Sequence, residues 1–140
     1  TKMADMGVEK TLLSSIDSLL NVDGGIVHIG ITEKKPTGIF NDLKLFPKKK
    51  RTQEEFEKKL RETLQNRLSD SYIGQTIRVT FPKTHSVTIC EIFVQRSSVP
   101  IFVITKNKDE EFYIRENGKL VRLSPRKQSE YIKEHFFGVD

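Results

Sequence analysis

The sequence predicts an α+β fold in a single domain, with three helices and a mixed or mostly antiparallel sheet of about five to six strands. Three observations support this prediction. Apolar residues recur at helical spacing in residues 8–20. Apolar and polar residues alternate in residues 75–81, which is typical of a half-buried strand. Turn residues separate two further apolar runs between residues 101 and 115, ahead of a capped C-terminal helix.

The first helix is predicted over residues 8–20, because its apolar residues fall on one stripe. Asn21 and the pair Gly24-Gly25 end it, since glycine tolerates the left-handed conformation of a helix terminus. Residues 26–31 are then expected to form a strand. The stripe consists of Val8, Leu12, Leu13, Ile16, Leu19 and Leu20.

A turn containing Pro36 is predicted at residues 33–38, with a short returning strand at residues 38–40. Residues 41–51 are expected to form a polar, basic loop. Thr52 followed by Glu55 is a capping-box signature that begins the second helix. The apolar stripe of that helix consists of Phe56, Leu60, Leu64 and Leu68.

Strands fill most of the second half of the chain. After the strand at 75–81, residues 82–86 are predicted to turn. Residues 87–94 are apolar on both faces apart from Thr88 and Glu91, which indicates a central strand. A loop at residues 97–100 should follow it.

The C-terminal part should contain a hairpin and a helix. Residues 101–106 and 111–115 are predicted strands joined by residues 107–110. Asn117-Gly118 is a second turn signal. Ser124 as N-cap and Pro125 at the first helical position begin a helix that ends near residues 135–136, and Tyr131, Ile132 and Phe136 are expected to dock it.

Positive charge is concentrated in two segments. Five basic residues and no acidic residue lie between Lys44 and Arg51, and five basic residues against Glu116 lie between Arg115 and Lys127. The whole chain carries a formal net charge of only +5, so the remainder is net acidic. Clustered Lys and Arg are typical of surfaces that contact phosphates, although a single lysine run is more often a solvated loop.

Several activities have no support in the sequence. The Gly-Lys pair Gly118-Lys119 lacks the preceding glycine and the following Ser or Thr of a phosphate-binding loop, and Gly24-Gly25 with Gly30 does not match a dinucleotide fingerprint. We therefore predict no cofactor, and an enzyme is disfavoured. No metal site is predicted, because His28, His85, His135 and Cys90 show no metal-ligand spacing. The single cysteine excludes an intrachain disulfide and is typical of a cytoplasmic protein. No membrane span is predicted.

An ordered set of short motifs runs along nearly the whole chain, from about residue 8 to residue 136. It consists of Leu19-Leu20-Asn21-Val22-Asp23-Gly24-Gly25, the strand 26–31, Thr37-Gly38-Ile39, Asn41-Asp42-Leu43, the helix 56–64, Glu111-Phe112-Tyr113-Ile114-Arg115, Asn117-Gly118, Arg122-Leu123-Ser124-Pro125 and Tyr131-Ile132. In this order and spacing the chain resembles the AlbA_2 family, also called the Schlafen AlbA_2 or divergent AAA-4 domain. Members usually carry an upstream strand with a Glu-Phe-Lys-type motif, which residues 1–7 lack.

The resemblance implies a nucleic-acid-binding module, with DNA preferred over RNA. Bacterial members often stand at the N-terminus of transcriptional regulators or helicase-like proteins, so we expect residues 1–140 to be one domain of a longer protein. The two clusters carry positive charge, as binding to the negatively charged phosphates of a nucleic acid requires. The predicted phosphate contacts are Lys48, Lys49, Lys50, Arg51, Arg115, Lys119 and Arg122. For Arg115, an ion pair with a neighbouring glutamate is an equally good interpretation.

Two other functions stay open at this stage. Some Schlafen proteins cleave RNA through clustered carboxylates that hold a divalent metal, for which Glu33, Asp42 and Glu9 are the acids available here. A protein-interaction module that forms a homodimer is the third interpretation. Tyr113 is a candidate for stacking on a base, although a hairpin tyrosine more often packs inside the protein.

Overall fold

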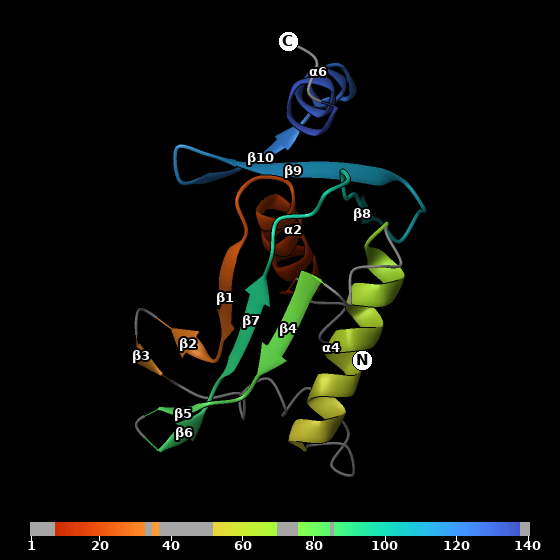
Figure 1. Cartoon of the computed structure of the whole chain (residues 1–140). Helices are drawn as coiled ribbons and strands as arrows, with labels where there is room; N and C mark the ends of the chain where they lie inside the picture. Colours follow the sequence, from red (N-terminus) through yellow and green to blue (C-terminus); the bar gives the residue numbers. More distant parts are fainter. Residues whose placement is uncertain (1–7, 33–34, 37–51, 70–75, 85, 138–140) are drawn as a thin grey trace.

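A computed structural model describes residues 8–32, 35–36, 52–69, 76–84 and 86–137 of the chain. These residues form three helices and ten strands, all paired in antiparallel fashion, which confirms the α+β class (Figure 1). The helices are α2 (Val8–Leu20), α4 (Gln53–Arg67) and α6 (Pro125–Phe136). The strands are β1 (Gly25–Ile29), β2 (Ile31–Thr32), β3 (Lys35–Pro36), β4 (Ile77–Thr80), β5 (Lys83–Thr84), β6 (Val87–Thr88), β7 (Cys90–Val94), β8 (Val103–Ile104), β9 (Glu110–Glu116) and β10 (Lys119–Leu123).

The six main strands are divided between two three-stranded sheets. One has the order β1-β7-β4, with β7 in the centre as predicted, and the other has the order β10-β9-β8. Figure 1 shows β9 running crosswise over the end of the first sheet, with α2 on one side of β9 and α6 on the other. The strand pairs β2-β3 and β5-β6 form two short ribbons.

Helix α2 joins the two sheets, because it packs against β1 and β7 of one sheet and against β8, β9 and β10 of the other. Leu13, Ile16 and Leu20 from the predicted stripe are completely buried. Asp17 and Asn21 lie on the same face, one turn apart, and are equally buried. The apolar stripe of α2 therefore contains two polar side chains that must find partners inside the protein.

Both predicted helix starts have the expected caps. The Thr52 hydroxyl accepts a hydrogen bond from the Glu55 backbone N–H at 3.2 Å. Helix α4 buries Phe56, Leu60 and Leu64 in the core shared by both sheets and contacts β8. The Ser124 hydroxyl accepts from the Lys127 N–H at 3.4 Å, with Pro125 in the first turn of α6. Helix α6 buries no residue completely, so its docking depends on a few half-buried side chains.

The structure corrects two predicted turns and one strand. Residues 35–36 lie in β3, paired with β2, and residues 83–84 lie in β5, paired with β6. The expected continuous strand at 87–94 is interrupted at Ile89, whose N–H donates to the Pro82 carbonyl instead of joining the ladder of β7. The returning strand predicted at 38–40 and the basic loop at 41–51 lie outside the described residues.

The junction after α2 requires a glycine for two independent reasons. Gly24 has a φ of +76°, in the left-handed region, and its N–H donates to the Leu19 carbonyl at 2.7 Å. A Cβ atom at this position would lie 2.5 Å from the Val94 carbonyl oxygen. Gly24 thus lets the chain turn back and allows β1 to approach the end of β7.

We expect Gly24→Ala to lower the free energy of unfolding by about 3 kcal/mol, from left-handed strain plus the collision with Val94. Gly118→Ala is a matched control, because Gly118 has the same φ of +76° and no atom within 4 Å of the added Cβ. Urea denaturation of both variants separates strain from collision. Equal losses of stability would show that the close approach to Val94 contributes nothing.

Among the described residues, no helix has the length and apolar character of a membrane span.

Candidate nucleic-acid interface

The hairpin of β9 and β10 places the C-terminal basic cluster. Asn117 and Gly118 have φ angles of 53° and 76°, as a two-residue turn matching the strand twist requires. The resulting register sets Leu120 opposite Arg115 and Arg122 opposite Tyr113. Arg115 and Arg122 are therefore diagonal neighbours on one face of the hairpin, whereas Lys119, opposite Glu116, points to the other face.

A series of polar contacts holds Tyr113, Glu111 and Arg122 together on this face. The Tyr113 hydroxyl donates to Glu111 Oε1 at 2.6 Å, and Arg122 Nη1 lies 3.2 Å from Glu111 Oε2. Burial, followed by the hydrogen bond and charge of Glu111, raises the pKa of Tyr113. Tyr113 is only 6% exposed, so it packs in the core and is not available to stack on a base.

Among the described residues, Arg122 pairs with Glu111, and no ion pair of Arg115 is found. Arg115 is half-buried, and within the described part of the chain its buried Nε atom has no hydrogen-bond partner. An unsatisfied buried donor is costly, and native structures usually complete such a group with an acceptor. Because this Nε atom is buried, it cannot itself reach a ligand at the surface of the hairpin.

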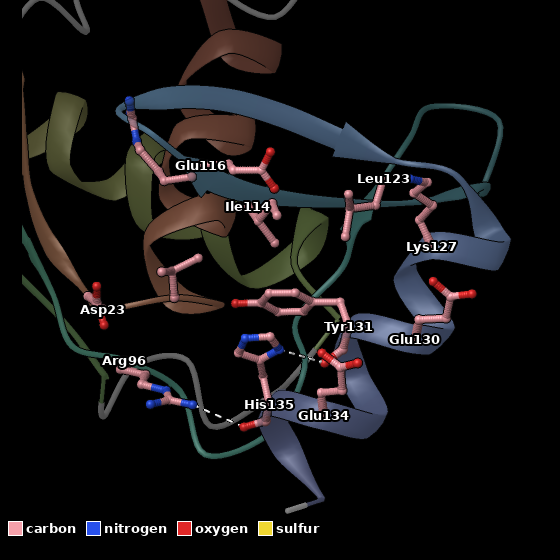
Figure 2. A pocket seen from close by; sticks show the side chains of 12 residues that line it. Asp23, Arg96, Ile114, Glu116, Leu123, Lys127, Glu130, Tyr131, Glu134 and His135 are labelled. Carbon is pink, nitrogen blue, oxygen red and sulfur yellow. Dashed lines mark hydrogen bonds between the residues drawn. The ribbon is translucent and has the colours of Figure 1, made fainter. Parts of the chain in front are cut away.

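Arg115 borders a groove of about 550 Å³ between the hairpin, α6 and the end of α2. Figure 2 shows Ile114 and Glu116 of β9 on one side of it, with Tyr131 and His135 of α6 below. The groove is lined by Val22, Asp23, Arg96, Ile114, Arg115, Glu116, Leu123, Lys127, Glu130, Tyr131, Glu134 and His135. Three of these residues are Arg or Lys and four are Asp or Glu, so the groove is not a uniformly cationic cradle.

Tyr131 holds α6 in place at the floor of the groove. Its hydroxyl donates to the Asn21 carbonyl at 2.7 Å, and its ring stacks on His135 with centroids 3.9 Å apart (Figure 2). Burial raises the pKa of the Tyr131 hydroxyl, which keeps it a donor. Arg96 Nη2 donates to the His135 carbonyl at 3.0 Å, closing the end of the helix.

Asp17 of α2 and Asn21, which directly follows this helix, set the position of β9 beneath the groove. The Tyr113 N–H donates to Asp17 Oδ2 at 2.9 Å. The Asn21 amide donates to the carbonyls of Tyr113 and Ile101 and to Asp17 Oδ2, and its oxygen accepts from the Ile101 N–H at 2.9 Å. Sequence reasoning missed both residues, although their spacing places them on the apolar stripe of α2.

The structure describes only some of the other residues predicted to bind phosphate or metal. Lys119 is exposed at the hairpin turn. Lys48, Lys49, Lys50 and Arg51 lie outside the described residues, as do Glu33 and Asp42 of the nuclease interpretation; Glu9 lies in the first turn of α2. Within the described ranges, no group of three His, Cys, Asp or Glu side chains could hold a metal ion.

Comparisons with known proteins agree with the fold. The family model described as Schlafen, AlbA_2 matches residues 2–124. Among solved structures, the chain is similar to the DIP2311 protein from Corynebacterium diphtheriae, with a TM-score of 0.57 and 15% identity. That similarity covers 91% of this chain and 22% of the other, so the chain spans less than a quarter of that protein. No curated protein sequence matches. The length of the family match shows that this chain belongs to the Schlafen AlbA_2 domain family.

Proposed function

We propose that this domain is a nucleic-acid-binding module that contacts phosphates through the β9–β10 hairpin. The observation that carries the proposal is the placement of Arg115 and Arg122 as diagonal neighbours on one face of the hairpin. Guanidinium groups bind phosphate oxygens through several N–H donors at once. Lys119, exposed at the turn, extends the cationic edge.

Arg122 keeps the ability to contact phosphate despite its ion pair. Its side chain is 60% exposed and its Nη1 atom lies 3.2 Å from Glu111 Oε2, whereas the Glu111 side chain is 10% exposed. The buried carboxylate therefore orients the arginine and leaves much of the guanidinium facing solvent. Because Asp23, Glu116, Glu130 and Glu134 line the groove, a phosphate backbone should follow the outer edge of the hairpin.

In this proposal DNA is the preferred partner and the domain is one part of a longer cytoplasmic protein, such as a transcriptional regulator or helicase-like protein. The family resemblance supports these points. Lys48, Lys49, Lys50 and Arg51 supply further phosphate contacts from the segment before α4. Contacts of this kind provide affinity with little dependence on base sequence.

Neutralising the hairpin by Arg115→Gln, Lys119→Gln and Arg122→Gln is expected to weaken binding to a DNA duplex about 100-fold at low salt, because three phosphate contacts are lost. Fluorescence anisotropy with a labelled duplex measures the change. The matched control neutralises Lys10, Lys58 and Lys83, which are exposed on other elements, and should change affinity by no more than about threefold.

Equal losses of affinity in the two triple variants would contradict the proposal, because they would show a nonspecific effect of net charge. Neutralising residues 48–51 tests the second cluster in the same assay. We expect about a further 10-fold loss of affinity when it is combined with the hairpin variant. The same duplex made of RNA tests the preference for DNA.

A further inference from the structure

The outer face of the β1-β7-β4 sheet carries a second set of residues suited to nucleic acid. The cross-strand register places Ile26, Phe93 and Arg78 side by side on this face. The neighbouring positions Val27, Ile92 and Val79 point the other way, into the core that α2 and α4 cover. Ile26 is 50% exposed, so the outer face presents an apolar side chain to solvent in the same cross-strand row as Arg78.

Arg78 and Phe93 form a layered pair. The Arg78 guanidinium carbon lies 4.8 Å from the centre of the Phe93 ring, a cation–π contact between neighbouring strands. Arg78 is exposed and Phe93 is half-buried. A planar guanidinium held against a ring is a surface on which a nucleobase can stack, since both groups offer flat faces.

The pair borders a hollow of about 610 Å³ where β1 begins and β7 ends. Its lining consists of Gly25, Arg61, Thr76, Ile77, Arg78, Phe93, Val94 and Gln95, with two arginines and no carboxylate. Arg61 pairs with Glu57 through Nε at 2.8 Å, and 49% of the Arg61 side chain is exposed. Two residues along the strands on the same outer face, Glu91 Oε2 is 3.3 Å from His28 Nε2. This lining differs from the groove beside α6, where carboxylates outnumber the Arg and Lys side chains.

We propose that this hollow binds one nucleotide of a single-stranded nucleic acid, with the base against Arg78 and Phe93 and the phosphate between Arg61 and Arg78. The proposal rests on the proposed function, which it extends from duplex backbone contacts to an unpaired base. Charge complementarity favours a nucleotide in this hollow, because the lining contains two arginines and an aromatic ring but no carboxylate. A duplex keeps its bases stacked inside and cannot place one on this face.

The test compares a labelled 12-nucleotide oligo(dT) with a DNA duplex, using fluorescence anisotropy on the same protein samples. Phe93→Leu keeps the apolar contact and removes the ring. We expect it to weaken oligo(dT) binding about 10-fold and to leave duplex binding within about twofold. Arg78→Lys keeps the charge but loses the planar group, and it should weaken oligo(dT) binding about fivefold.

Phe137→Leu is the matched control, because Phe137 is a 68% exposed aromatic residue beyond α6, and it should change neither affinity. Thermal unfolding of each variant checks the fold; if Phe93→Leu is unfolded, Arg78→Lys decides alone. Oligo(dT) binding unchanged in Phe93→Leu and Arg78→Lys, but lost in the hairpin variant, would overturn this inference and leave the proposed function standing. Wild-type protein that binds neither nucleic acid would overturn the proposed function as well.

Discussion

Replacing Asn21 with alanine is expected to lower the free energy of unfolding by about 4 kcal/mol, among the largest effects of any single substitution. Asn21 is fully buried, and its side chain satisfies the N–H and carbonyl of Ile101 and the carbonyl of Tyr113. Alanine would leave these three backbone groups without partners, and each buried unsatisfied group costs about 1–3 kcal/mol. The loss should also loosen β9, because Tyr113 lies in that strand.

Urea denaturation followed by circular dichroism measures the effect of Asn21→Ala. Asn66→Ala is the matched control, because Asn66 is exposed on α4 and its removal should change stability by no more than about 0.5 kcal/mol. A loss of less than about 1 kcal/mol in Asn21→Ala would contradict the role of this residue in joining α2 to β9 and to the segment at Ile101.

Asp17→Asn is expected to change how stability depends on pH. Asp17 is fully buried and burial raises its pKa well above the ordinary value of 3.8, although the Tyr113 N–H and the Asn21 amide act in the opposite direction. Within the described residues Oδ1 has no hydrogen-bond partner, so nothing else compensates a charge there. The folded protein therefore favours the neutral acid, which asparagine matches in shape.

The sign follows from linkage. As pH rises above 3.8, Asp17 of the unfolded chain loses its proton first, so wild-type stability falls until pH passes the folded-state pKa. Asparagine does not titrate, so the stability of Asp17→Asn relative to wild type should increase by up to about 1.4 kcal/mol per pH unit in this window. Urea denaturation from pH 4 to pH 8 measures the difference, with the exposed Asp23→Asn as control. A difference that stays constant with pH would contradict the neutral buried acid.

The local signals in the sequence predicted most of the fold. Thr52, Ser124 and Pro125 identified the starts of α4 and α6, because a cap depends only on neighbouring backbone groups. Asn117-Gly118 identified the hairpin turn for the same reason. The short ribbons β2-β3 and β5-β6 could not be predicted, since two-residue strands carry no periodic pattern.

The hairpin that carries Arg115 and Arg122 was predicted, whereas their contact with phosphate stays a prediction. The Asn117-Gly118 turn signal was enough to place Arg115 and Arg122 on one hairpin, but the register that makes them diagonal neighbours was not predicted. The sequence could not show that Glu111 pairs with Arg122 or that the carboxylates of α6 line the same groove as Arg115, because these placements depend on strand register and on how separate elements pack. Arg61, Arg78 and Phe93 likewise belong to three different elements, and the pairing of β4 with β7 together with the position of α4 brings them to one hollow.

The central claim is that the β9–β10 hairpin contacts phosphates, and the salt dependence of affinity tests it most directly. Plotting the logarithm of the association constant for a DNA duplex against the logarithm of salt concentration gives a slope that counts the phosphate contacts. Wild type should show a steep negative slope, and Arg115→Gln should reduce its magnitude by about one unit, whatever the duplex sequence. A slope that is the same in wild type and Arg115→Gln would contradict the claim.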